Sequence, residues 1–203
     1  MARVKVCGVM TVAEAVECVA LGVDAVGVNL VEGSPRRVGE ERAAEIARAV
    51  GGRTLVVAVV AGLDVEEARG VVARTGVGCL QLHGDEPASV VEALLPHAYK
   101  AVRIEGQEDV VAAAGMPGEY VLVDAKVRGQ LGGTGHVFEW GLVRALARAR
   151  KLVLAGGLTP ENVAEAVRQV RPWCVDVASG VESAPGVKDM GKVRAFVAAA
   201  KGE

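Results

Sequence analysis

The sequence lacks the residue clusters that mark metalloproteins and disulfide-stabilised proteins. It has only three histidines in 203 residues, and its four cysteines, Cys7, Cys18, Cys79 and Cys174, lie far apart and form no C-x-x-C pair. Structural zinc sites and disulfide frameworks both depend on several such residues at short, regular spacings. We therefore expect neither a metal ion nor a disulfide.

The sequence also has no excess of positive charge and no long apolar run. Lysine and arginine number 23 against 25 aspartates and glutamates, which gives a net charge of −2 without any basic cluster. Nucleic acids and anionic membranes attract clustered positive charge, so neither is an expected partner. A membrane span needs about 18 continuous apolar residues, which no segment approaches. Because no apolar signal core follows Met1-Ala2-Arg3, we expect a cytoplasmic protein.

Short, valine-rich runs alternate with segments of helical periodicity along the whole chain. The runs predict strands at residues 3–7, 24–29, 54–60, 77–82, 98–103, 120–124, 151–155 and 173–178. The periodic segments predict helices at residues 11–21, 40–50, 64–75, 86–95, 107–114, 139–149, 160–170 and 187–200. This pattern predicts an α/β fold, a (β/α)8 TIM barrel in which residues 1–203 form a single domain. An open, doubly wound sheet is the alternative, but it would require a break in the alternation that the sequence does not show.

Cys7 and Asp124 each close a predicted strand, and active sites of barrels form at the carboxyl ends of their strands. Side-chain alternation places Lys5 on the same face as Cys7, where its charge and the helix start at Thr11 would favour a thiolate. Asp124 ends an apolar run, where burial would help a carboxyl group to keep its proton and act as a general acid. The alternatives are a buried, inert cysteine and an aspartate that caps a loop. If Cys7 and Asp124 face each other across the barrel mouth, the pair predicts acid–base chemistry on a small substrate, without a metal or an organic cofactor.

Glycine-bearing turns follow the predicted seventh and eighth strands. The first contains Gly156 and Gly157, and the second contains Ser179 and Gly180. These two loops often bind phosphate in barrels of this class, because glycine permits close approach and exposes backbone N–H groups to the anion. Glycine at both expected loops predicts a phosphate-bearing substrate, whereas one such pair would indicate only an ordinary turn.

Several further residues and one loop are candidates for contact with a substrate. The guanidinium of Arg36, or that of its neighbour Arg37, after the second strand, can hold a carboxylate through two parallel hydrogen bonds, although a solvated loop arginine is the simpler interpretation. Asp176, in the eighth strand, is expected first to pair with Lys5 and second to contact substrate. His83 ends the fourth strand and would line the mouth or serve as a structural donor. Residues 125–138 contain four glycines and predict a lid that excludes water.

A set of short motifs recurs in order from residue 4 to residue 182. They are Lys5-Val6-Cys7-Gly8, Ser34-Pro35-Arg36, Gln81-Leu82-His83-Gly84, Val123-Asp124, Gly132-Gly133-Thr134-Gly135, Gly156-Gly157-Leu158, Val175-Asp176-Val177 and Ser179-Gly180-Val181-Glu182. Each is weak alone, but together they make the chain resemble phosphoribosylanthranilate isomerase, an enzyme of tryptophan biosynthesis, over essentially its whole length.

The resemblance implies a particular reaction and particular roles. The reaction is the Amadori rearrangement of N-(5-phosphoribosyl)anthranilate to 1-(2-carboxyphenylamino)-1-deoxyribulose 5-phosphate, an aldose–ketose isomerisation. By resemblance, Asp124 would protonate the ring oxygen and Cys7 would take the proton from C2′. Arg36 would hold the anthranilate end, and the two glycine-bearing turns would hold the phosphate.

Two other functions remain as alternatives at this stage. One is another phosphosugar isomerase on the same barrel, such as the histidine-pathway enzyme, whose family has an aspartate where this chain has Cys7. The other is a non-catalytic protein that binds a phosphate-bearing ligand on the same scaffold. Arginine outnumbers lysine 16 to 7, which fits either a thermophilic protein or a GC-rich coding bias. A thermophilic origin would favour a homodimer.

Overall fold

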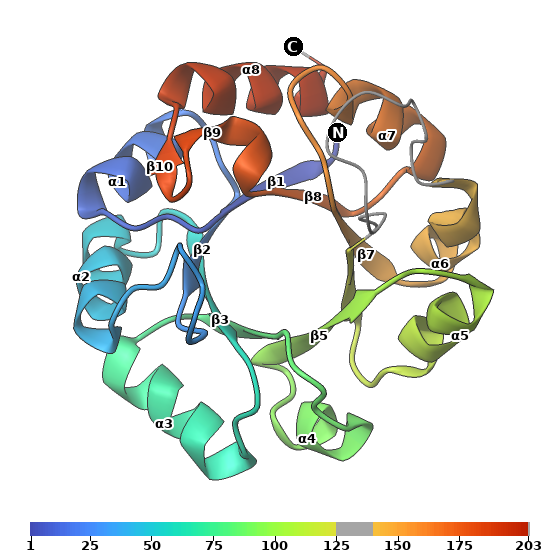
Figure 1. The fold of residues 1–203 in the computed structure, drawn as a ribbon, viewed down its shortest axis with the longest axis horizontal. Coiled ribbons are helices and arrows are strands. Elements are labelled where there is room, and N and C mark those ends of the chain that lie inside the picture. The colour runs from blue at the N-terminus through green and yellow to red at the C-terminus, as the bar shows by residue number, and fades with distance from the viewer. Residues whose placement is uncertain (125–139, 203) are drawn as a thin grey trace.

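The computed structural model shows a closed barrel of parallel strands inside a ring of helices (Figure 1), and it describes residues 1–124 and 140–202. The strands pair in chain order, and the last closes against the first. They are β1 (Arg3–Cys7), β2 (Ala25–Asn29), β3 (Leu55–Val60), β4 (Cys79–Leu82), β5 (Ala98–Arg103), β6 (Tyr120–Asp124), β7 (Lys151–Ala155) and β8 (Cys174–Val177). The predicted TIM barrel is confirmed, whereas the predicted lid at residues 125–138 lies outside the described residues.

One main helix follows each strand and covers the outside of the barrel. These helices are α1 (Val12–Ala20), α2 (Glu40–Val50), α3 (Val65–Thr75), α4 (Ala88–Ala93), α5 (Gln107–Gly115), α6 (Arg144–Ala149), α7 (Val163–Val170) and α8 (Met190–Lys201). Two short 3-10 helices, η1 (Trp140–Val143) and η2 (Ser179–Val181), and a hairpin of β9 (Glu182–Ala184) and β10 (Val187–Lys188) complete the order. No helix in the described ranges is long and apolar enough to cross a membrane.

Local sequence signals determine where several helices begin. At α1, the Thr11 hydroxyl accepts a hydrogen bond from the backbone of Glu14, whose carboxylate accepts one from the backbone of Thr11. The same reciprocal cap joins Asp64 and Glu67 at α3. Such a box satisfies two of the backbone N–H groups that a helix leaves unpaired at its start. These caps fix the direction in which each helix leaves the barrel mouth.

Several predicted helices begin later than their periodicity indicates, and the structure shows the reason at two of them. The helix predicted at residue 160 begins at Val163, because the chain first forms a turn in which the backbone N–H of Thr159 donates to the side chain of Asn162. The helix predicted at residue 187 begins at Met190, because residues 182–188 form the β9–β10 hairpin and Asp189 caps the helix instead. In both cases a polar turn interrupts the helical pattern before the first helical residue.

The strands bury both of their faces. Residues that point outward, such as Val4, Val26 and Val60, pack against the helices in the main hydrophobic core. Residues that point inward, such as Val57 and Leu122, form a second cluster inside the barrel. Burial on both faces explains why the strands are nearly continuous apolar runs in the sequence.

Two hydrogen-bonded pairs form a polar layer inside the barrel. The Lys5 ammonium on β1 lies 2.8 Å from the Asp176 carboxylate on β8, and both side chains are buried. The Tyr99 hydroxyl donates to the side chain of Gln81 at 3.0 Å. Asp176 and Gln81 face a cavity above the layer, whereas Lys5 and Tyr99 face one of about 360 Å³ at the amino-terminal end of the barrel. The ion pair predicted between Lys5 and Asp176 is therefore confirmed, and it lies where β1 meets β8.

We predict that the Lys5→Met substitution destabilises the protein by about 3–5 kcal/mol, because it leaves the Asp176 carboxylate buried without a counter-charge. Replacing both partners, as in Lys5→Met with Asp176→Leu, removes that uncompensated charge and is expected to recover much of the loss. The free energy of unfolding in urea measures both effects. A single variant as stable as the wild type, or a double variant less stable than the single one, would contradict the prediction.

Candidate active site

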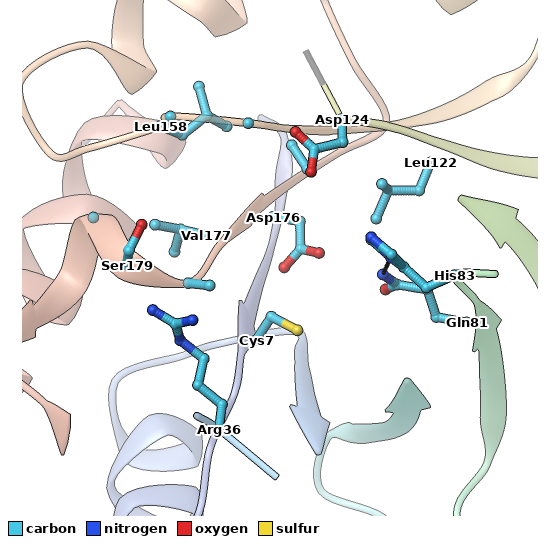
Figure 2. A pocket seen from close by; sticks show the side chains of 15 residues that line it. Cys7, Arg36, Gln81, His83, Leu122, Asp124, Leu158, Asp176, Val177 and Ser179 are labelled. Atoms are coloured by element: carbon cyan, nitrogen blue, oxygen red, sulfur yellow. Dashed lines mark hydrogen bonds between the residues drawn. The ribbon is translucent and has the colours of Figure 1, made fainter. Parts of the chain in front are cut away.

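A cavity of about 310 Å³ opens at the carboxyl ends of the strands, and nine candidate site residues, including His83 of the loop after β4, line it. They come from both sides of the barrel: Cys7 from β1, Arg36 from the loop after β2, Asp124 from β6, Gly156 and Gly157 after β7, Asp176 from β8, and Ser179 and Gly180 from η2. Figure 2 shows Cys7, Asp124 and Asp176 pointing toward the same space. The structure therefore brings the predicted acid, base and substrate contacts to one place.

The thiol of Cys7 lies at the wall of this cavity beside a glycine. Cys7 and Gly27 are partners across β1 and β2, and a Cβ atom on Gly27 would lie 2.8 Å from the Cys7 sulfur and 3.1 Å from the Lys5 nitrogen. Only hydrogen fits there without displacing the thiol or the amine. Gly27 is thus a residue of the site that sequence reasoning missed, because nothing in its local pattern shows what faces it.

Lys5 lowers the pKa of Cys7, as the sequence predicts, but it is not the largest influence on that pKa. Burial raises the pKa of Cys7 above its ordinary value by more than the charge of Lys5 lowers it. The Lys5 ammonium forms an ion pair with the Asp176 carboxylate, with 2.8 Å between the two groups. At the start of α1, the backbone N–H groups of Met10 and Thr11 donate to the Glu14 carboxylate and not to sulfur. The resting cysteine is a thiol.

Across the cavity, Asp124 stands at the end of β6 with polar neighbours from β4. The side-chain nitrogen of Gln81 lies 3.1 Å from Nδ1 of His83, and both residues line the cavity with Asp124. Because Gln81 also accepts the hydrogen bond from Tyr99, its amide is oriented by the polar layer below. His83 therefore lines the mouth of the barrel, which was one of the two roles predicted for it from the sequence.

The turns after β7 and β8 approach each other closely at the predicted phosphate loops. Gly156 and Gly157 adopt φ values of 97° and 64°, which favour glycine. A Cβ atom on Gly180 would overlap the carbonyl oxygen of Leu158. Glycine at these positions lets the two loops pack together and face one anion with little side-chain bulk between.

Arg36 reaches the cavity from the loop after β2, and it is held there by Glu182. Its Nε and Nη2 atoms each donate to one carboxylate oxygen of Glu182, both at 2.7 Å. Sequence reasoning missed this partner, since the two residues are 146 positions apart and no local pattern links them. In the sequence, Glu182 was noted only as the last residue of the motif that begins at Ser179, and no role was predicted for it.

A second buried ion pair supports the loop that carries His83. The Lys100 ammonium donates to the carbonyl oxygens of Leu82 and Gly84 and lies 3.2 Å from the Glu86 carboxylate. Glu86 in turn accepts hydrogen bonds from backbone N–H groups, including that of Gly62. These contacts fix the ends of β3 and β4 beside the cavity.

Within residues 1–124 and 140–202, no group of three His, Cys, Asp or Glu side chains could hold a metal ion.

Comparison with known proteins gives a consistent family assignment. A family model described as N-(5'phosphoribosyl)anthranilate (PRA) isomerase matches residues 4–199. The N-(5'-phosphoribosyl)anthranilate isomerase of Myxococcus xanthus is 46% identical over 98% of this chain and 96% of its own length. The crystal structure of phosphoribosyl anthranilate isomerase from Thermotoga maritima has 35% identity and a TM-score of 0.91, with full coverage of both chains. A phosphoribosyl anthranilate isomerase in complex with reduced 1-(o-carboxyphenylamino)-1-deoxyribulose 5-phosphate has 33% identity and a TM-score of 0.89, again over both whole chains.

We predict that alkylation of Cys7 by iodoacetamide still accelerates as the pH rises past 9, because only the thiolate reacts and burial raises the pKa of this thiol. Mass spectrometry of the peptide that carries Cys7 measures the rate. The same peptide in the urea-unfolded chain is the reference, and its rate should level off above an ordinary thiol pKa of about 8.5. A folded-state rate that already levels off below about pH 8 would show a resting thiolate.

Proposed function

The chain belongs to the N-(5'-phosphoribosyl)anthranilate isomerase family and catalyses that isomerisation in tryptophan biosynthesis, and we propose that Cys7 and Asp124 carry out its proton transfers. The observation that supports these roles most strongly is a single cavity of about 310 Å³ lined by both groups, by Arg36 and by the two glycine-bearing loops. A thiol and a carboxyl group on opposite walls suit a reaction that needs an acid on one atom and a base on another.

Asp124 acts first, as the general acid. It gives a proton to the ribose ring oxygen while the bond from that oxygen to C1′ breaks, and the nitrogen lone pair forms a C1′–nitrogen double bond. The ring is then open and the nitrogen carries a positive charge. A carboxyl group at the end of β6 stands on the wall opposite the cysteine, which suits protonation of one side of the sugar and deprotonation from the other.

Cys7 then acts as the general base. As the thiolate, it takes the proton from C2′, and the released electron pair forms the C1′–C2′ double bond of an enolamine and neutralises the nitrogen. The enolamine becomes the ketone when its C2′ hydroxyl loses a proton and C1′ gains one. Because burial raises the pKa of Cys7, the thiol must lose its proton before it can act.

The two ends of the substrate would be held away from the reacting carbons. The phosphate would lie at the loops of Gly156, Gly157, Ser179 and Gly180, which line the cavity and lie at the end of the barrel where this fold binds phosphate through backbone N–H groups. The anthranilate carboxylate would meet Arg36. Asp176 keeps a substrate-contact role in this proposal, because its Oδ1 atom is buried without a hydrogen-bond partner and the residue lines the cavity.

We predict that Cys7→Ser and Asp124→Asn each lower kcat/KM by about 10²- to 10⁴-fold, since each removes one proton-transfer group. Steady-state turnover of phosphoribosylanthranilate measures the loss. Cys79→Ser is the matched control, because Cys79 faces the cavity at the opposite end of the barrel, and it should keep nearly full activity. Unimpaired turnover in either site variant would remove that residue from the mechanism.

We also propose that the protein is a cytoplasmic homodimer. One solved structure from Thermotoga maritima, 32% identical to this chain, is described as generated monomers of a dimeric phosphoribosylanthranilate isomerase, which names the enzyme they derive from as a dimer. Light scattering during gel filtration is expected to give a mass near twice the 20.9 kDa of one chain. A mass of one chain at micromolar concentration would contradict the dimer without affecting the catalytic proposal.

A further inference from the structure

The guanidinium of Arg36 has one edge occupied and one edge free for substrate. Of its five N–H groups, one on Nε and one on Nη2 donate to Glu182. The remaining N–H groups lie on Nη1 and at the outer side of Nη2, and that edge of the fork can still bind a second carboxylate through two hydrogen bonds. Figure 2 shows Arg36 reaching into the cavity with its guanidinium leading. A substrate carboxylate therefore has a defined place to bind.

We propose that Glu182 is a positioning residue for substrate recognition: it fixes Arg36 so that only this free edge meets the carboxylate of the substrate. The inference rests on the proposed role of Arg36 and adds the residue that makes that role possible. Glu182 itself touches no reacting atom. Its carboxylate also repels any second carboxylate from the Nε edge, which restricts binding to one orientation.

Glu182 can hold Arg36 because its own position is fixed. Its side chain is only 5% exposed, and the Lys188 ammonium, which is fully buried, lies 2.7 Å from its carboxylate. Lys192 donates to its backbone carbonyl oxygen at 2.8 Å. Although burial opposes ionisation, the hydrogen bonds from Arg36 and Lys188 lower the pKa of Glu182 to about 2. At any physiological pH the residue is a charged, immobile acceptor.

The other end of the Arg36 side chain is fixed by close packing on Gly8. A Cβ atom on Gly8 would lie 2.5 Å from Cδ of Arg36, and Gly8 has a φ of 75°. The aliphatic part of Arg36 therefore crosses the residue that follows the catalytic Cys7. Held by Gly8 at its stem and by Glu182 at its head, Arg36 keeps a constant position relative to the thiol, which is what a preorganised binding group requires.

Lys188 gives this arrangement the charge that an anion needs. Arg36 and Glu182 alone sum to zero, so a second carboxylate would meet a neutral pair. The Lys188 ammonium, which lies against Glu182 and also donates to the carbonyl oxygen of Ala178, brings the sum of the three groups to +1. The backbone N–H of Lys188 donates to Glu14 of α1, which anchors the hairpin to the first helix. The group of three is thus suited to one carboxylate.

The test compares two ligands that differ only in the group Arg36 is proposed to bind. One is reduced 1-(o-carboxyphenylamino)-1-deoxyribulose 5-phosphate, and the other is the same compound without its carboxyl group. In Glu182→Gln, one of the two acceptor oxygens becomes a donor, so Arg36 loses its fixed side-on partner. Calorimetry is expected to show that this variant binds the carboxylated ligand roughly 10- to 100-fold more weakly and the other ligand as the wild type does. KM for the substrate should rise by a similar factor, with kcat changed much less.

The matched control is Glu40→Gln. Glu40 holds Arg74 through the same side-on pair, with contacts of 2.5 and 2.8 Å, but on the outer surface between α2 and α3. This variant should bind both ligands as the wild type does. Glu182→Asp keeps the negative charge but has a shorter side chain. It should weaken binding of the carboxylated ligand selectively, to a smaller degree than Glu182→Gln. This variant provides a second readout if Glu182→Gln does not fold.

Four results would overturn the inference. Equal weakening of both ligands in the Glu182 variants would show a general structural role, and no weakening of either would show that Arg36 needs no partner. If Arg36→Met loses the preference for the carboxylated ligand while the Glu182 variants keep it, the inference fails and the role of Arg36 stands. If the wild type binds both ligands equally, the proposed role of Arg36 fails together with the inference.

Discussion

A buried ion pair lies where the barrel closes, and the active site is built on it. Lys5 and Asp176 are partners in the register of β1 and β8, the two strands that complete the ring. Two charges in so apolar an interior are stable only together, so each determines the position of the other. Asp176 then forms part of the floor of the cavity, and Lys5 contributes a positive charge beneath Cys7.

A second set of charges connects the loops above this floor. Glu14 joins the start of α1 to the β9–β10 hairpin through its bonds to Thr11 and Lys188. Within the hairpin, Lys188 holds Glu182, and Glu182 reaches across to Arg36. The loops after β1, β2 and β8 are therefore linked by charged hydrogen bonds between groups that are mostly shielded from water. A site assembled from separate loops gains rigidity in this way.

The barrel was predictable from the sequence because its signal is local and repeated. A strand buried on both faces appears in the sequence as a valine-rich run. The end of β6 could be predicted because such a run stops at Asp124. Parallel strand ends meet at one rim, so Cys7 and Asp124 could be placed in one site without coordinates. The Arg36–Glu182 pair and the space beside Gly27 were not predictable, since each depends on segments distant in sequence. The pKa of Cys7 was not predictable either, because burial is a property of the assembled fold and it outweighs the nearby charge of Lys5.

The polar layer inside the barrel determines how substrate can enter the enzyme and how product can leave it. Lys5 and Tyr99 face the lower cavity, and their partners Asp176 and Gln81 face the upper one, so the two spaces are divided by buried, hydrogen-bonded side chains. The central axis is closed and offers no passage from one end to the other. Substrate must arrive and product must depart through the same opening, one molecule at a time. Bound product therefore occupies the very entrance that the next substrate needs.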